Sequence, residues 1–493
     1  MIVIVSAVTA ETQQADDAFL KALDAISTER MLADIRTLSG PSFNGRQAGT
    51  EYDLLSAQWV AQEFLSAGLR LPSIFNGSLT LPFAKGKYGT SLGVMVTTVP
   101  TSIISPDLAL RIGTADRLST TNLGSDYLPV FDAPSADVQA QIVFVGYGIV
   151  DPAQGIDDYA GIDVNNSIVL FLRGKPDHYQ HPFSHADKVR FARERGALAY
   201  LTTTGPILHP YEARRGVTGK PSAFYGQLPP DQAIPGAWIS TALAEGILAG
   251  STGATPDRLR TLQERLSKAP SSQSIRTNQF ASLQWKVKTN DGMLANVVGF
   301  IPGTGPDTIL IGAHRDHFGR PADLLFPGAD DNASGTTVML ELSRTLVKTG
   351  LHPQRTILFV SFSGEEKDLL GSRLYTSHPI LPLSSTKAMI NIDHAGVGNG
   401  RLTVGVTGLE KSVALEAGQT AGLSDKLDVF GFFPGGDHVP FKEAGVPTIT
   451  VVSGGVHPHF HQPTDTADTI DPEILKTVAR YVLALTWQLA NEP

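Results

Sequence analysis

The sequence predicts a mixed α/β protein whose mostly parallel sheet is covered by helices on both faces. Two short runs rich in β-branched residues, Ile309–Gly312 and Ile357–Phe362, are bounded by glycine, serine or charged residues. Such runs are typical of strands that are buried on both faces of a parallel sheet. Between them, Val338, Leu342 and Leu346 recur at helical spacing before Gly350. Strands that alternate with helices in this way indicate a layered α/β architecture.

Length and composition limit the function classes. A chain of 493 residues is too long for one ordinary core and favours two or three structural units. The net charge of −9 argues against nucleic acid or an anionic membrane surface as the main partner, and no apolar run is long enough to span a membrane. The chain has no cysteine, so disulfides and thiolate metal ligands are excluded.

Candidate ligands and proton carriers follow the two buried runs. His314 and Asp316 come after the first run, and Glu365 and Glu366 come after the second. Asp331 lies between them in a turn-rich segment of small residues. In open α/β sheets the ligand site lies beyond the carboxyl ends of the strands, so these side chains are expected to converge. Histidine and carboxylate donors suit a catalytic zinc site, and one carboxylate can bridge two metal ions.

These residues, together with Asn391-Ile392-Asp393 and the segment His459-Phe460-His461-Gln462-Pro463, carry a family resemblance. The chain resembles zinc-dependent aminopeptidases and related exopeptidases of the M28 peptidase family, especially members with an inserted protease-associated domain. The resemblance implies two Zn²⁺ ions and the zinc-exopeptidase fold. It makes His314 and Asp393 ligands of one zinc, Glu366 and His461 ligands of the other, and Asp331 the bridge. It also makes Glu365 the general base and Asp316 the carboxylate that orients His314.

The C-terminal histidines leave an alternative open. His457, His459 and His461 are all candidate ligands by residue type, and the resemblance selects His461 because a Pro-x-Asp-Thr segment follows it. His459 is the rival to be tested. Many family members carry tyrosine immediately before the ligand histidine, whereas this chain has Phe460, which has no donor for an oxyanion.

The chain divides into three expected parts. Residues 1–15 resemble the remnant of a signal peptide, which favours a periplasmic or secreted protein and leaves a cytoplasmic location open. Residues 16–115 and 286–493 are expected to form the zinc peptidase domain. Residues 116–285 resemble a β-rich protease-associated domain, on the basis of Tyr147-Gly148-Ile149 and Val169–Gly174. Residues 205–285 are expected to be mainly an irregular return segment with one helix, Asp257–Ser267.

Several other motifs have a structural interpretation. The G-x-S-x-G match at Gly89–Gly93 lacks the strand before it and the helix after it that a serine nucleophile needs. His178, His181 and His185 are predicted to be loop histidines rather than a further metal site. Asp437 lies in a segment for which a structural role near the cleft is favoured. His317 and Asp330, next to candidate ligands, are expected to orient them.

The predicted function is that of a dinuclear zinc metallopeptidase that cleaves peptide substrates at their chain ends. The leading hypothesis is an aminopeptidase. One alternative is an exopeptidase of the glutamate-carboxypeptidase type, which needs basic residues in the specificity pocket; Arg315, Arg320 and Arg401 are the candidates. The other is a non-catalytic binding module that has kept the fold. Assembly into a homo-oligomer stays open.

Overall fold

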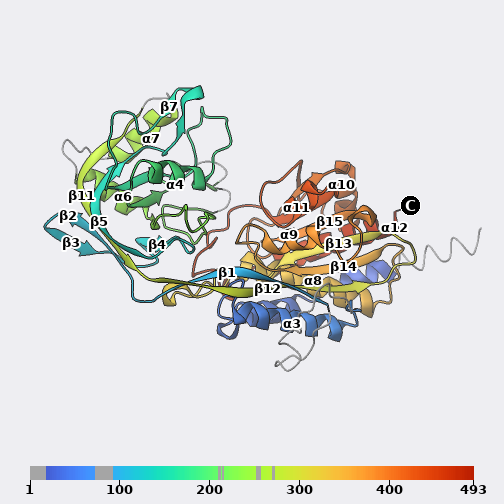
Figure 1. The fold of residues 1–493 in the computed structure, drawn as a ribbon. Helices are drawn as coiled ribbons and strands as arrows, with labels where there is room; N and C mark the ends of the chain where they lie inside the picture. Colours follow the sequence, from blue (N-terminus) through green and yellow to red (C-terminus); the bar gives the residue numbers. More distant parts are fainter. Residues whose placement is uncertain are drawn as a thin grey trace, which may run out of the picture.

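The structure is a computed structural model that describes residues 18–72, 93–208, 212–213, 216–250, 257–268 and 272–492. Two units lie side by side, joined by the long strands β1 and β12 (Figure 1). The main unit contains the described residues before Ser105 and after Lys286. The inserted unit contains the described residues between 108 and 285. The expected signal-peptide remnant lies outside the described residues, as does nearly all of the G-x-S-x-G match.

The main unit is built on a mixed eight-stranded sheet of order β1-β12-β14-β13-β15-β18-β16-β17. Its centre consists of parallel strands: β13 (Thr308–His314), β14 (Thr356–Phe362), β15 (Thr386–Asp393) and β18 (Thr448–Ser453). The remaining strands are β1 (Val94–Ile104), β12 (Val287–Ile301), β16 (Leu402–Thr407) and β17 (Leu427–Phe430). Every residue of β13 is buried, in keeping with its apolar stretch Ile309–Ala313.

Helices cover both faces of this sheet, which confirms the predicted fold class. One face carries α2 (Thr28–Leu38), α3 (Glu51–Ala67), α8 (Gly335–Lys348), α10 (Lys411–Thr420) and α12 (Pro472–Asn491), whose apolar residues share one core with the sheet. The other face carries α9 (Leu370–Ser377) and α11 (His438–Glu443). Asp471 caps α12 by accepting hydrogen bonds from the backbone N–H groups of Glu473 and Ile474.

The inserted unit is a second eight-stranded sheet of order β3-β2-β11-β5-β8-β9-β10-β4. Its strands are β2 (Ala109–Thr114), β3 (Arg117–Thr120), β4 (Tyr127–Pro129), β5 (Ala136–Phe144), β8 (Ile168–Leu172), β9 (Ala199–Thr203), β10 (Gly236–Ile239) and β11 (Ile275–Trp285). A short hairpin, β6 (Val150–Asp151) with β7 (Ile156–Asp157), stands apart. Helix α4 (His185–Glu194) packs on one face of the sheet, and α6 (Thr241–Ala249) and α7 (Arg258–Lys268) pack on the other.

Two features of this unit differ from the sequence-based expectation. The second sheet already begins at β2, before the expected boundary at residue 116. The segment 205–285, expected to hold one helix, also contributes α6, β10 and the long strand β11. In β11 the inward residues Ala281, Leu283 and Trp285 do alternate with more exposed ones, but the polar first half of the strand hides that period.

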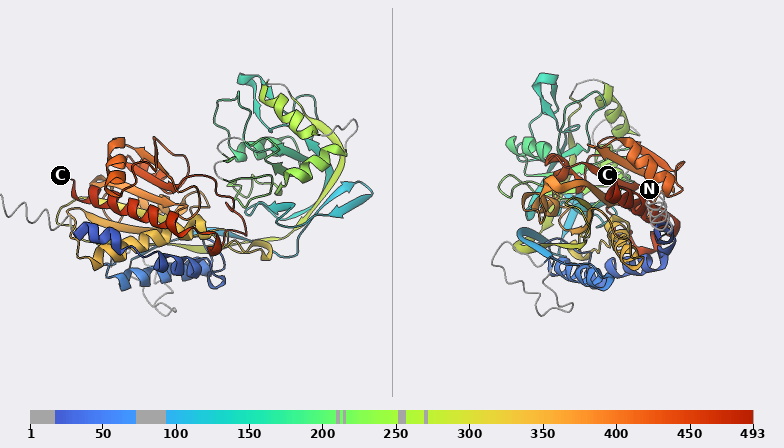
Figure 2. Two further views of the ribbon diagram at one scale, coloured as in Figure 1. Left: turned by 180° about the vertical axis from the view of Figure 1, so that it is seen from behind. Right: turned by 90° about the vertical axis from the view of Figure 1, so that its right-hand side faces the viewer.

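The two units meet in a small aromatic core. Phe131 of the inserted unit packs against Phe318 and Phe326 of the main unit, with ring centroids 5.6 and 5.5 Å apart. Tyr225 adds a contact to Phe318 at 5.4 Å. The view from behind shows the same side-by-side arrangement (Figure 2). Within the described ranges, no helix is both long and apolar enough to cross a membrane.

Candidate metal centre

The candidate residues gather at the carboxyl ends of the parallel strands of the main unit. His314 and Asp393 are the last residues of β13 and β15, and Glu365 and Glu366 follow β14. His461 lies in the loop after β18. Because neighbouring parallel strands end at the same edge, these four chain segments bring their side chains into one crevice.

Asp331 stands between the two histidines predicted to bind metal. Its Oδ1 lies 3.4 Å from His314 Nε2, and its Oδ2 lies 3.1 Å from His461 Nε2. His314 Nε2 is also 3.4 Å from Asp393 Oδ1, and His461 Nε2 is 3.4 Å from Glu366 Oε2. Each histidine therefore shares Asp331 and has a second carboxylate of its own, which is the arrangement that a bridging carboxylate requires.

The loop that carries Asp331 is held by buried partners. Asp465 accepts hydrogen bonds from the backbone N–H groups of Asp330 and Asp331 at 2.9 and 3.0 Å. The fully buried guanidinium of Arg46 donates to the carbonyls of Pro327 and Gly328 at 2.8 Å and to that of Arg315 at 2.5 Å. These contacts hold the Asp331 loop, and with it the Asp331 carboxylate, in place.

His314 and Asp316 are close, but not in the way that the sequence suggests. His314 Nδ1 lies 3.2 Å from the backbone carbonyl of Asp316 and 3.7 Å from its carboxylate. The carbonyl is within hydrogen-bonding distance and the carboxylate is not. The Asp316 carboxylate instead accepts the backbone N–H of Glu365 at 3.2 Å, and so it links the β13 and β14 ends of the site.

His317 and Asp330, which lie next to predicted ligands in the sequence, have buried partners in the crevice. His317 is completely buried, and its Nδ1 lies 2.6 Å from Oε1 of the predicted ligand Glu366. Asp330 Oδ2 is 2.6 Å from His457 Nδ1 and 3.2 Å from His394 Nδ1, two histidines outside the predicted ligand set. Of the two residues, His317 is therefore the one placed to orient a predicted ligand.

The inserted unit orients His461. His461 Nδ1 lies 2.8 Å from the carbonyl of Ala223, so Nε2 is left to face Asp331 and Glu366. The His461 carbonyl in turn accepts the N–H of Ala223 at 3.0 Å. Phe460 stacks on the His461 ring with centroids 3.6 Å apart and packs with Val217 and Trp238 of the inserted unit. Its apolar ring is thus part of the contact between the units.

The electrostatics of the crevice favour a cation. Burial raises the pKa of Glu365 to about 8 and that of Glu366 well above its usual value, with nearby carboxylates adding to both shifts. Burial opposes ionisation of Asp331 as well, yet His394, His461 and His317 hold its pKa well below the usual range. Crowded, buried carboxylates of this kind need a positive charge to ionise together.

The donor set fits a metal. Three donor atoms of His314, Glu365 and Asp393 lie within 4.8 Å of one another, and so do three of His317, Asp331 and Glu366. His314 Nε2 and Asp393 Oδ1 are buried and have no hydrogen-bond partner. Imidazole nitrogens and carboxylate oxygens are the donors that zinc prefers in catalytic sites.

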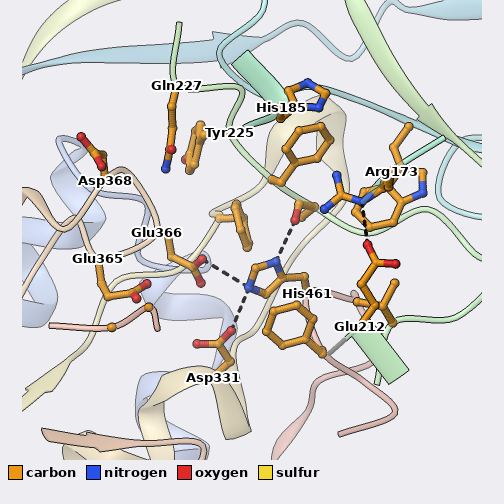
Figure 3. A pocket seen from close by; sticks show the side chains of 18 of the residues that line it. Arg173, His185, Glu212, Tyr225, Gln227, Asp331, Glu365, Glu366, Asp368 and His461 are labelled. Atoms are coloured by element: carbon orange, nitrogen blue, oxygen red, sulfur yellow. Dashed lines mark hydrogen bonds and ion pairs between the residues drawn. The ribbon is translucent and has the colours of Figure 1, made fainter. Parts of the chain in front are cut away.

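A cavity of about 900 Å³ opens over the crevice and is lined by both units. Asp331, Glu365, Glu366 and His461 lie on one side, and Arg173 and Glu212 of the inserted unit lie on the other (Figure 3). Aromatic side chains line the space between the two sides: Phe183, Phe224, Tyr225, Trp238, Phe318 and Phe460. A volume near the upper end of the usual range for small-molecule sites, roughly 300–1,000 Å³, suits a short peptide.

The other sequence candidates lie elsewhere. His459 is half-buried, and its Nδ1 lies 2.9 Å from the hydroxyl of Thr464. Arg315 is buried against Asp53, Arg320 contacts Asn44 and Arg401 pairs with Asp428. Of the three candidate histidines of the inserted unit, His178 contacts Ser267 and His181 lies near Asp151. His185, predicted to lie in a loop, is instead the first residue of helix α4 and contacts Tyr200.

Sequence reasoning missed partners that come from distant segments. The sequence analysis did not predict that Asp465 and Arg46 hold the Asp331 loop. It also did not predict the contact of the Ala223 carbonyl with His461, or the basic residues Arg173 and Lys175 in the cavity. For Arg173 a signal existed, because it directly follows the buried strand β8. A contact through a backbone carbonyl, such as that of Ala223, cannot be inferred from the type of the residue.

Comparisons with known proteins give a family match and several similar proteins. Residues 296–486 match the family model Peptidase family M28. Aminopeptidase YwaD of Bacillus subtilis (strain 168) is 29% identical over 239 residues, which cover 46% of this chain and 51% of that protein. A probable leucine aminopeptidase of Trichophyton verrucosum (strain HKI 0517) is 27% identical over 56% of this chain and 84% of its own. The chain thus spans about half the length of the first relative and more of the second.

Two solved structures are similar over almost the whole chain. An aminopeptidase from Aneurinibacillus sp. strain AM-1 has a TM-score of 0.63 and 25% identity, covering 97% of both chains. A peptidase M28 precursor from Shewanella amazonensis SB2B has a TM-score of 0.67 and 18% identity, covering 97% of this chain and 96% of its own. At 18% identity the second likeness concerns the fold alone.

Proposed function

We propose that this chain, whose residues 296–486 match peptidase family M28, is a dinuclear zinc aminopeptidase that releases residues from the N-terminus of peptides. The observation that carries the proposal is Asp331, whose two oxygens face His314 and His461 at 3.4 and 3.1 Å. One zinc would be held by His314 and Asp393 and the other by His461 and Glu366, with Asp331 shared. The relatives named as aminopeptidases support the activity.

Zinc ions bound there would lower the pKa of a water molecule and polarise the scissile carbonyl. Glu365 would accept the proton of the attacking water and then donate it to the leaving amine. The hydrogen bond from its backbone N–H to Asp316 holds the Glu365 backbone beside His314. The burial that raises the pKa of Glu365 suits this role, because a base must hold the proton between the two steps.

Substitution of Glu365 tests the assignment. We expect Glu365→Gln to lower kcat by roughly 10²–10⁴-fold, the usual share of general acid–base catalysis, while two zinc ions remain bound. Kinetics on a leucine peptide and a zinc titration of the same preparation measure both quantities. Glu443→Gln, exposed on α11, controls for the quality of the variants. Loss of one zinc in Glu365→Gln would make Glu365 a ligand, and full activity would refute its role as base.

A further inference from the structure

The far wall of the cavity carries positive charge. Arg173, Lys175 and Lys188 of the inserted unit line it, opposed there by the single carboxylate of Glu212. The main-unit side carries the carboxylates Asp331, Glu365, Glu366, Asp368 and Asp393. The cavity is therefore polarised: one end attracts an ammonium group and the other a carboxylate.

The position of Arg173 is fixed by the second sheet and by an aromatic ring. It directly follows β8, which lies between the parallel strands β5 and β9, so it stands at the carboxyl end of the second sheet. Its backbone N–H donates to the carbonyl of Thr203 at 2.8 Å. Its guanidinium lies 3.8 Å from the centroid of the Trp238 ring and points toward the middle of the cavity (Figure 3). Stacking on an aromatic ring holds a guanidinium in place without using its N–H donors.

Lys188 fixes the loop that carries Arg173. It is 3% exposed, and its Nζ donates to the carbonyls of Leu172 and Gly174 at 2.7 and 2.5 Å. The positive field on this wall affects its neighbours: burial first, and Arg173 second, lower the pKa of both Lys188 and His185. Glu212 Oε1 lies 3.6 Å from Arg173 Nε, beyond hydrogen-bonding distance. A guanidinium has five N–H donors, so Arg173 can serve a second carboxylate.

We propose that Arg173 forms a carboxylate-binding subsite for the leaving side of the substrate, so that short peptides with a free carboxylate are the preferred substrates. This inference rests on the proposed function. The substrate ammonium lies toward the carboxylates of the main unit, and its carboxylate lies toward Arg173. The carboxylate is either the C-terminal group of a di- or tripeptide or an acidic side chain after the scissile bond.

Arg173→Met tests the subsite, because it keeps an apolar stem over Trp238 and removes the charge. We expect the preference of the enzyme for Leu-Gly-Gly over its C-terminal amide to fall by roughly ten- to a hundredfold in kcat/KM, mainly through KM, the size expected for a lost charged hydrogen bond. Arg173→Lys should keep part of the preference. Arg190→Met, on the exposed side of α4, should keep all of it.

A second pair of peptides, Leu-Asp-Gly amide and Leu-Asn-Gly amide, separates the two sources of the carboxylate. An Arg173-dependent preference in the first pair supports the C-terminal group, and one in the second pair supports the acidic side chain. Equal losses on acids and amides would show a merely structural role and overturn the proposal, as would no loss at all.

Equilibrium binding separates this inference from the proposed function. In a Glu365→Gln background, calorimetry of Leu-Gly-Gly and its amide measures affinity without turnover. The acid should bind about tenfold more tightly, and Arg173→Met should abolish the difference. If the wild-type protein cleaves no peptide, the aminopeptidase proposal fails while this binding difference still tests Arg173. If it cleaves peptides and neither preference depends on Arg173, only the subsite fails.

Discussion

His317 shows how a residue outside the predicted ligand set can control the metal centre. It is completely buried, and its Nδ1 lies 2.6 Å from Glu366 Oε1. A histidine that donates this hydrogen bond holds the glutamate with its other oxygen toward His461. Burial lowers the pKa of His317 well below its usual value.

We therefore expect His317→Ala to weaken the affinity for one of two zinc ions by about 10–100-fold, the usual cost of losing a partner of a metal ligand. Competition with a chromophoric chelator measures both affinities. His378→Ala, at an exposed histidine, is the matched control. An unchanged zinc affinity in His317→Ala would show that the contact with Glu366 is incidental.

The predicted ligands converge because residue type and strand position together constrain them. His314, Asp393 and the Glu365-Glu366 pair sit at or just after the ends of adjacent parallel strands, and those ends could be found from the apolar runs. The acceptor for His314 Nδ1 could not be found in the same way. Whether the carbonyl or the carboxylate of Asp316 is nearer depends on the local backbone path.

Helix α4 of the inserted unit carries a lysine whose charge is costly in the folded protein. Burial, followed by Arg173, lowers the pKa of Lys188 from 10.5 to about 7. Because the folded pKa lies below the unfolded one, the folded protein releases a proton that the unfolded chain keeps. The contribution of Lys188 to stability is therefore largest at high pH and is lost as the pH falls through about 7.

Lys188→Met should reveal this linkage. The wild-type protein should gain stability over the variant as the pH rises from 7 to 10, by at most about 1.4 kcal/mol per pH unit. Urea unfolding at several pH values measures the difference, with Lys220→Met, at an exposed lysine, as the control. A difference that is constant with pH would mean that Lys188 has an ordinary pKa.

At the scale of elements, the sequence predicts the main sheet well and the inserted one in part. The buried strands β13, β14 and β8 contain apolar runs that local pattern can detect, and β9 begins with Ala199-Tyr200-Leu201. Strands β16 and β17 and helix α10 were not predicted, and α6 was missed because Gly246 interrupts a short helix of few charged residues. The secondary structure of such segments depends on long-range contacts rather than on local sequence pattern.

At the scale of the whole molecule, the inserted unit is directly coupled to the candidate metal centre. Ala223 contacts His461 through both its N–H and its carbonyl, and Gln462 donates to the carbonyl of Pro221 at 2.9 Å. Zinc that holds His461 therefore also fixes the contact with the inserted unit. We expect zinc to slow hydrogen exchange in the segment around Ala223 as well as at the crevice.

Exchange measured by mass spectrometry tests this coupling. Strand β3 at the outer edge of the second sheet should not respond and serves as the internal control. Protection of the His461 loop without protection around Ala223 would show that the two units act separately.

Zinc should also stabilise the protein as a whole. The crowded carboxylates of the crevice repel one another, and a ligand that binds only the folded state stabilises it by mass action. At free zinc 100-fold above its dissociation constant, the gain is about 2.7 kcal/mol. Thermal unfolding with zinc and with a chelator measures it. Equal stability in both conditions would contradict a metal centre at Asp331.

The most direct test of the central claim is the cleavage of unblocked peptides, followed by mass spectrometry, with a chelated sample alongside. A zinc aminopeptidase removes residues stepwise from the N-terminus, spares N-acetylated peptides and stops in the chelator. Loss from the C-terminus would contradict the aminopeptidase polarity and favour a carboxypeptidase. No cleavage by zinc-loaded protein would contradict the enzyme itself and favour a binding module.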